Sequence, residues 1–198
     1  MAIFTPNLET VAQLRQKPTS GEWYLLQFLK GTLDDSYQVF FQPFLNGDMP
    51  DIIIMREGSG VYIIEVKDWN LNKYSIGPKL KWHLKSNEKV RLTSPIDQVN
   101  RYKSQLYKLH IPGLALEKLK NKSLWGVVNC GVYFHLHGTD ESTKFTADVH
   151  DLKEGSWSET SYRAKLKYTD VFGSDIVGED FLKIMETRRM TRESRYFT

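Results

Sequence analysis

The sequence predicts an α/β domain in which a mixed central β-sheet is flanked by helices. Two segments, at about 21–33 and from 94 onward, carry apolar residues at helical spacing, and a stretch of short strands lies between them. The two central strands, at 51–55 and 61–67, are apolar at successive positions. This pattern is typical of a sheet that is covered on both faces, as in an α/β fold.

The first half of the chain is divided by clear turn and capping signals. Thr19 or Ser20 can cap the helix at 21–33, and the aromatic and β-branched residues at 37–44 predict a strand. The strands at 51–55 and 61–67 are joined by a short loop with two glycines, so they form a hairpin. The basic, aromatic segment at 73–85 contains a Gly-Pro turn and predicts a second, protruding hairpin.

The second half begins with a helix that opens at Ser94-Pro95. Its apolar stripe consists of Ile96, Val99, Tyr102, Leu106 and Leu109. A short helix at 114–122, a buried strand at 124–134, strands at 144–151 and 162–168, and a closing helix at 180–187 follow. We expect residues 1–137 to form the core, and 138–198 to complete it or to lead into a further domain.

Composition narrows the class of protein. The chain has 198 residues, 40% hydrophobic and 26% charged, which excludes disorder and a coiled coil. The single cysteine, Cys130, excludes an intramolecular disulfide and a zinc site built from several thiolates. With neither a membrane-length apolar run nor a signal peptide, we expect a cytoplasmic protein without a membrane partner. The net charge of +3 is too small to indicate nucleic-acid binding by itself.

Three ionisable residues stand at the ends of the two central strands. Asp51 opens the first strand, and Glu65 and Lys67, which project to one face, close the second. The hairpin brings Asp51 and Glu65 to the same end of the sheet, but strand register decides whether they share a face. Two carboxylates beside an amine suit Mg²⁺ and the activation of water for phosphodiester hydrolysis. The alternative is a structural ion-pair cluster.

Residues on the two helices extend this pattern. Gln98 and Tyr102 are one helical turn apart and share a face, although Tyr102 also fits the core stripe. Glu22, preceded by Gly21, lies at the start of the first helix, where a carboxylate also favours the helix dipole.

Taken in order, these motifs resemble the nuclease-related domain (NERD) family of the PD-(D/E)XK nuclease superfamily. The motifs are Gly21-Glu22, Pro50-Asp51, the Glu-Val-Lys-Asp-Trp run at 65–69, and Pro-Ile-Asp-Gln at 95–98 followed by Tyr102. The resemblance covers residues 20–109 well and the strand at 124–134 more loosely. It implies a PD-(D/E)XK, restriction-endonuclease-like core.

The resemblance also implies roles for individual residues. Asp51, Glu65 and the Val66 carbonyl would bind Mg²⁺, for which Mn²⁺ can substitute, and Glu22 would add a further acidic ligand. Lys67 would orient or activate the attacking water. Gln98 with Tyr102 would hold Lys67 or the substrate.

The distribution of basic residues points to a phosphate-bearing partner. Five cations lie within thirteen residues of sequence, interleaved with Trp82: Lys79, Lys81, Lys85, Lys89 and Arg91. Arg101 adds charge on the second helix. Basic residues contact phosphates and aromatic residues stack on bases, and the alternative is a solvated surface.

We therefore expect a Mg²⁺-dependent nuclease that hydrolyses DNA, with RNA as a second candidate substrate. Family members often precede a helicase, so a fused C-terminal helicase is a further expected partner, and defence against foreign DNA a further expected role. The competing hypothesis is a non-catalytic nucleic-acid-binding or regulatory module that positions such a helicase.

Overall fold

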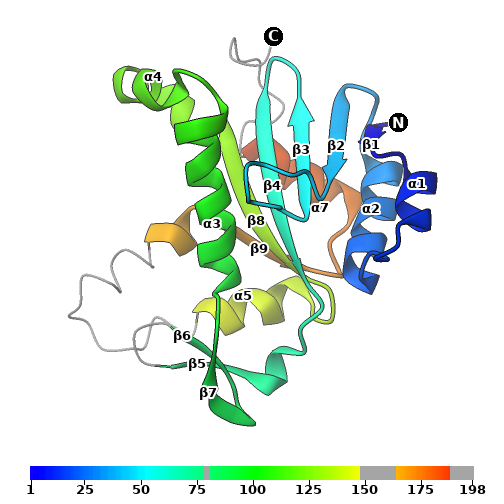
Figure 1. Ribbon diagram of the computed structural model, residues 1–198, viewed down its shortest axis with the longest axis vertical. Helices are drawn as coiled ribbons and strands as arrows, with labels where there is room; N and C mark the ends of the chain where they lie inside the picture. The colour runs from blue at the N-terminus through cyan, green and yellow to red at the C-terminus, as the bar shows by residue number, and fades with distance from the viewer. Residues whose placement is uncertain (78–80, 148–163, 188–198) are drawn as a thin grey trace.

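The protein folds as a central sheet with helices on both faces and a small second sheet beyond one end (Figure 1). The computed structural model describes residues 1–77, 81–147 and 164–187. Within these residues the predicted mixed sheet flanked by helices is confirmed.

The central sheet has six strands in the order β1-β2-β3-β4-β8-β9. Pairing is antiparallel from β2 to β3 and from β3 to β4, and parallel in the other neighbouring pairs. The bounds are β1 (Ile3–Thr5), β2 (Tyr37–Phe41), β3 (Ile52–Arg56), β4 (Gly60–Lys67), β8 (Val128–Phe134) and β9 (Asp170–Gly173).

The helices divide between the two faces because the strand residues alternate between two hydrophobic cores. In β4, Ile64 and Val66 pack in one core, with α2 and α7, and Ile63 packs in the other, with α3. The described helices are α1 (Leu8–Gln13), α2 (Ser20–Thr32), α3 (Pro95–Gln105), α4 (Leu114–Lys120), α5 (Thr139–Ala147) and α7 (Gly178–Thr187). Short helical turns are η1 (Leu71–Lys73), the π-helical η3 (Leu106–His110) and η4 (Lys122–Gly126).

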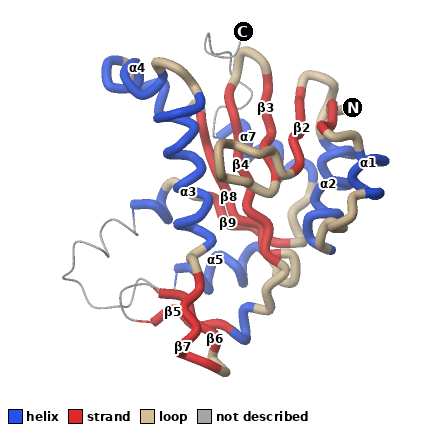
Figure 2. Tube along the Cα trace, viewed as in Figure 1, coloured by secondary structure: helices blue, strands red, loops and turns tan. Residues whose placement is uncertain are grey.

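The predicted second hairpin is a three-stranded sheet, which Figure 2 shows beyond the end of α3. It consists of β5 (Tyr74–Gly77), β6 (Lys81–Leu84) and β7 (Asn87–Leu92). Trp82 on β6 is fully buried and stacks with Phe134 of β8, so this sheet is attached to the main core through its inner face.

Two predicted strands are wrong where the structure describes them. Residues 144–147, the first part of the strand predicted at 144–151, belong to α5, and 148–151 lie outside the described residues. Residues 164–167 are helical rather than part of a strand at 162–168. In α5, Thr146 is buried and Phe145 packs on the core, so tertiary contacts override a short alternating pattern.

The apolar stripe predicted for the second helix ends at Leu106, because Leu109, its last predicted member, is exposed. The helix continues from α3 into the π-helical turn η3. A π-helical turn holds more residues than an α-helical one, which rotates Leu109 away from the face shared by Ile96, Val99 and Leu106.

The described part of the predicted C-terminal extension joins the main fold. β9 pairs with β8, and Phe181 and Met185 of α7 are fully buried in the core beneath α2. None of the described helices combines the length and the apolar character needed to cross a membrane.

Candidate active site

The register of β3 and β4 brings Asp51 and Glu65 to the same face. Ile52 pairs with Ile64, so Asp51 is opposite Glu65 at the next position. Residues opposite one another in an antiparallel pair project to the same side of the sheet. That side is the one covered by α3, because Ile53 and Ile63 pack in the core with α3.

The side chain of Asp51 continues the hydrogen bonding of the sheet beyond the start of β3. Its Oδ2 accepts a hydrogen bond of 2.8 Å from the Val66 backbone N–H. The N–H and C=O of one strand residue point to the same neighbour, so the Val66 carbonyl also points toward β3. The Lys67 carbonyl points the other way, and accepts from the N–H of His135 at 3.0 Å. The Val66 carbonyl oxygen therefore lies on the same edge as the Asp51 carboxylate.

Glu65 and Lys67 form a buried ion pair. The Lys67 Nζ is 2.5 Å from Oε1 of Glu65, a residue that is only 1% exposed. The second carboxylate oxygen, Oε2, is buried and has no hydrogen-bond partner. An oxygen in this position is disfavoured unless a ligand satisfies it or the Asp51 carboxyl, when protonated, donates to Glu65.

The amide of Gln98 connects Lys67 to the helix α3. Its Oε1 lies 3.5 Å from the Lys67 Nζ, and its Nε2 is 3.0 Å from the Tyr102 hydroxyl. Tyr102 donates in turn to the Met49 carbonyl at 3.5 Å, just before Pro50-Asp51. Gln98 and Tyr102 therefore join α3 to the segment that carries Asp51, as the sequence predicted that they would approach the site.

Burial dominates the electrostatics of the two carboxylates. The pKa of Asp51 is raised to about 7, first by desolvation and then by the charge of Glu65, while the Val66 N–H and Lys67 oppose the shift. Desolvation also raises the pKa of Glu65, against the opposing effect of the Lys67 ammonium. A site that holds two acids against their preference for water is suited to bind a cation.

Glu22 occupies a different position from the other two acids. Its carboxylate closes the capping box of α2 by accepting from the Thr19 N–H at 2.6 Å, and Gln42 donates to its other oxygen at 2.9 Å. Its charge still reaches the site, since it contributes to raising the pKa of Asp51 and of Glu65. Among the described residues there is no ready group of three acidic, histidine or cysteine side chains that could hold a metal ion.

Sequence reasoning missed Gln42, Met49 and the position of Trp69. Gln42 pairs its backbone N–H with the Asp51 carbonyl at 2.9 Å and has a positive φ of 45°. The Lys67 Nζ lies 5.5 Å from the centre of the Trp69 ring, which stacks on Tyr74. Trp69 could have been found, because an aromatic residue two positions after Lys67 lies on the same side of an extended chain.

The predicted nucleic-acid-binding residues other than Arg101 separate into three groups. Trp82 is fully buried, and its ring packs against Phe134 in the core. Its predicted role in stacking on bases is therefore wrong. Lys81, Lys89 and Arg91 are exposed and share the outer face of the small sheet, and Lys85 is exposed at its turn. Lys79 lies outside the described residues.

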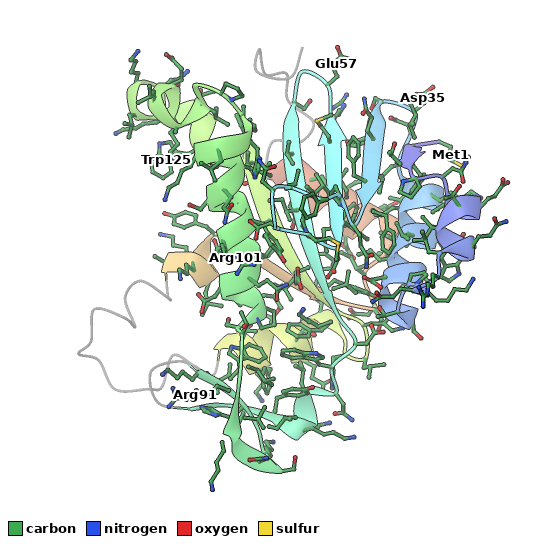
Figure 3. All side chains as sticks on the ribbon, in the orientation of Figure 1. Met1, Asp35, Glu57, Arg91, Arg101 and Trp125 are labelled. Carbon is green, nitrogen blue, oxygen red and sulfur yellow. The ribbon has the colours of Figure 1, made fainter. Side chains whose placement is uncertain are left out.

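Arg101 lies on α3 beside the candidate site, far from Arg91 (Figure 3). It is paired with Asp48 at 3.2 Å, and its guanidinium lies over the Tyr102 ring. It is therefore a neighbour of the carboxylate cluster rather than an extension of the basic sheet.

The mixed sheet and the acid-lysine cluster at its end define a nuclease-like α/β domain. The family model described as nuclease-related domain (NERD) matches residues 17–134, which is more than half of the chain, and the chain belongs to this family. No curated protein and no solved structure matches the chain significantly.

Proposed function

We propose that the protein is a metal-dependent nuclease that hydrolyses DNA phosphodiester bonds. The observation that carries this proposal is the buried pair of carboxylates, one with an unpartnered oxygen, held beside a lysine at the end of a central hairpin. Membership of the nuclease-related domain family supports the same chemistry.

The donor set fits a hard divalent cation. Glu65 Oε2 lacks a partner, Asp51 lies opposite, and the Val66 carbonyl points to the same edge. These are oxygen ligands, which Mg²⁺ prefers and which Mn²⁺ also accepts. Glu22 would contribute indirectly, through the effect of its charge on Asp51 and Glu65 and through its hydrogen bond from Gln42. When bound, such a cation lowers the pKa of a water ligand and neutralises charge on a phosphodiester.

The residues of the chain supply positioning and charge around the reacting phosphate. Lys67 would donate to a phosphate oxygen or to the attacking water, with its ammonium held by Glu65 and Gln98. Tyr102 keeps the Gln98 oxygen turned toward Lys67 by accepting from the amide nitrogen. Because Glu65 and Gln98 hold Lys67, and Tyr102 holds Gln98, little reorganisation is needed when negative charge develops.

Loss of the lysine provides the direct test. We expect Lys67→Ala to lower the cleavage rate of plasmid and single-stranded DNA by about 10²–10³-fold with Mg²⁺. Lys30→Ala, which removes an exposed lysine from α2, is the control and should cleave like the wild type. Equal rates for Lys67→Ala and the wild type would show that the catalytic assignment is wrong.

Cation binding is measured separately from cleavage by the melting temperature. At a Mg²⁺ concentration about 100-fold above its Kd, the wild type should gain about 2.7 kcal/mol in stability. Asp51→Asn and Glu65→Gln should lose this gain, and Lys30→Ala should keep it. A protein that binds DNA but shows no Mg²⁺-dependent stabilisation or cleavage would instead be a nucleic-acid-binding module.

A further inference from the structure

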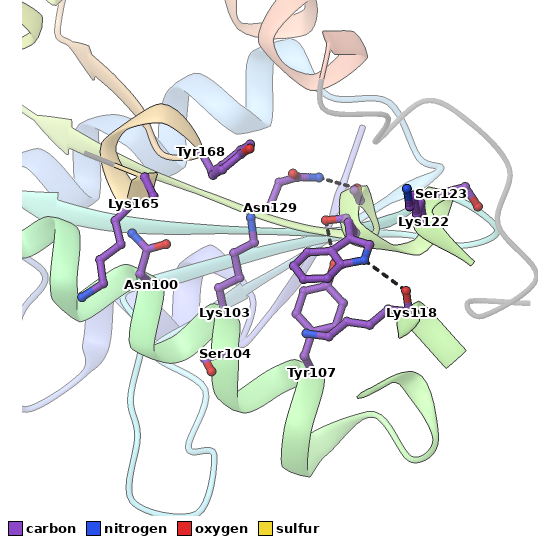
Figure 4. A pocket seen from close by; sticks show the side chains of 13 residues that line it. Asn100, Lys103, Ser104, Tyr107, Lys118, Lys122, Ser123, Asn129, Lys165 and Tyr168 are labelled. Atoms are coloured by element: carbon purple, nitrogen blue, oxygen red, sulfur yellow. Dashed lines mark hydrogen bonds between the residues drawn. The ribbon is translucent and has the colours of Figure 1, made fainter. Parts of the chain in front are cut away.

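A cavity of about 710 Å³ lies beside α3 (Figure 4), on the other flank of this helix from the candidate active site. An α-helix turns by roughly 100° per residue, so Gln98 and Tyr102 project to one side of its buried stripe and Asn100 and Lys103 to the other. The contacts agree: Tyr102 reaches Met49 near β3, and Asn100 reaches Thr169 just before β9. The two sites are therefore separate.

Positive charge and aromatic rings dominate the lining of this cavity, which we call the lysine-aromatic pocket. No acidic side chain is among the described residues that line it. The lining residues that carry its chemistry are Lys103, Lys118, Lys122, Lys165, Trp125 and Tyr168. Lys165 is paired with Asp97, which lies outside the lining set.

Lys118 shows that the positive charge is concentrated in the pocket. Its Nζ lies 4.2 Å from the centre of the Tyr107 ring and 4.8 Å from that of Trp125. Its pKa is lowered, first by burial and then by the charges of Lys108 and Lys103. An anion in the pocket would relieve this repulsion.

The aromatic side of the pocket is built on a fixed frame. The buried Tyr107 hydroxyl lies 2.8 Å and 2.9 Å from the carbonyl oxygens of Leu124 and Trp125, and accepts from the Val128 N–H at 3.2 Å. The Trp125 Nε1 donates to the Lys118 carbonyl at 3.0 Å, which sets the orientation of its ring. Despite these contacts Trp125 is 56% exposed, and Tyr168, which also lines the pocket, is 54% exposed. A large ring that is held in place but left open to solvent, as that of Trp125 is, is suited to stack on a flat ligand.

We infer that the lysine-aromatic pocket binds a nucleotide unit, with a phosphate among its ammonium groups and a base against its exposed rings. The unit is either part of a single strand or a free nucleotide, since both carry the same chemistry. This inference rests on the proposed function: the pocket would bind the nuclease's substrate or product at a nucleotide away from the cleaved bond. The polar side chains of Asn100, Asn129 and Ser104 also line the pocket.

The test measures binding in EDTA, where the proposed cleavage is absent. The probe is a fluorescent (dT)6 oligonucleotide followed by anisotropy, with intact length checked on a gel. We expect Trp125→Ala to weaken binding by about 10-fold, within the range for loss of one stacked base, and Trp125→Phe to restore most of it. Lys118→Gln/Lys122→Gln should lower the salt dependence by about 1.4 in log–log slope.

The matched control is Arg15→Gln/Lys30→Gln, which removes two exposed charges, one shortly after α1 and one on α2. Figure 1 shows these two helices on the opposite side of the central sheet from α4. Binding by this variant should stay within about twofold of the wild type. Circular dichroism checks folding, and Lys122→Gln alone, an exposed side chain, repeats the test if Lys118 proves necessary for stability.

Competition distinguishes the sources of the ligand. Displacement by dTMP at millimolar concentration would assign the pocket to a free nucleotide, and displacement by unlabelled (dT)6 alone would assign it to a strand. The inference is overturned if the pocket variants bind (dT)6 as the control does, or if poly-L-glutamate of equal charge competes as well as (dT)6. Failure of the proposed nuclease activity would appear in the Lys67→Ala comparison and would leave this binding result unchanged.

Discussion

At the scale of single residues, Asp51 and Glu65 are held where their charged forms are disfavoured. Burial raises the pKa of both. The Val66 N–H and the Lys67 ammonium oppose this shift at Asp51, and the Lys67 ammonium and a hydrogen bond with Asp51 oppose it at Glu65. An apolar side chain in place of either would avoid this penalty. The proposed cation would offset this penalty, because it would bind the charged forms of both acids.

The shifted pKa of Asp51 predicts a specific dependence of stability on pH. Its pKa is about 7 in the folded chain and 3.8 in the reference state, so the folded state binds the proton more tightly. The stability from this group is full below about pH 4 and is lost as the pH rises through about 7. We expect the free energy of unfolding of Asp51→Asn, relative to that of the wild type, to increase by about 1–2 kcal/mol from pH 5 to pH 8. Urea unfolding in EDTA measures this difference.

The control is Asp35→Asn, an exposed aspartate at a turn. The difference in free energy of unfolding between Asp35→Asn and the wild type should stay constant over the same pH interval. A constant difference for Asp51→Asn as well would mean that Asp51 is not buried as its neutral acid.

At the scale of elements, the N-terminus of α2 is docked onto the end of β4 through Gly21. The Gly21 N–H donates to Asp68 at 3.1 Å, and a Cβ on Gly21 would lie 2.0 Å from the Asp68 Oδ1 and 2.8 Å from the His135 Cβ. Only a glycine allows this approach. It places the next residue, Glu22, within reach of Gln42.

Gly21→Ala is therefore expected to destabilise the fold by about 1–3 kcal/mol, because backbone or side chains must move to admit the methyl group. Gly31→Ala in the same helix is the matched control: nothing lies within 4 Å of its Cβ, so it should be neutral or stabilising by up to about 1 kcal/mol. Thermal unfolding of both variants tests the difference. Equal melting temperatures would contradict the close docking of α2.

At the scale of the whole molecule, a near-neutral total charge conceals a separation of charges. The acids gather at the end of β3 and β4, while Lys81, Lys89 and Arg91 cover the outer face of the small sheet. A duplex that contacts this face would release counterions.

Neutralising these three cations together, as Lys81→Gln/Lys89→Gln/Arg91→Gln, should lower the salt dependence of duplex DNA affinity by about 2–3 in log–log slope. Arg15→Gln/Lys17→Gln/Lys30→Gln, with the same change in charge near α1 and α2, serves as the control. If both triple variants lower the slope equally, the effect is one of net charge and the small sheet is not the contact surface.

The C-terminal helix belongs to the main core, and this too is testable. Phe181 is fully buried and packs edge-on against Phe28 of α2, whereas its neighbour Leu182 is 36% exposed. We expect Phe181→Ala to cost about 3–5 kcal/mol and to lower a single, global unfolding transition, and Leu182→Ala to cost much less. Separate unfolding of α7, with the rest of the fold unchanged, would contradict a shared core.

The residue pattern was sufficient to predict most of the elements and to place Asp51, Glu65 and Lys67 at one end of a hairpin. Capping at Thr19, the Ser94-Pro95 start and the continuous apolar run of β4 are local signals. The two helix starts and the strand are confirmed. Alternation alone was not sufficient at 144–147, where a helix forms because Phe145 and Thr146 pack inward.

The sequence by itself determined the order of the elements and the kinds of side chain at the sheet end, because these depend on local periodicity and turn chemistry. Only the tertiary structure decided that Asp51 and Glu65 share a face, since that depends on register between separate strands. It also decided that Trp82 is buried and that Trp125 is open. Burial depends on which distant segments pack together, and that information is not carried by any single stretch of the chain.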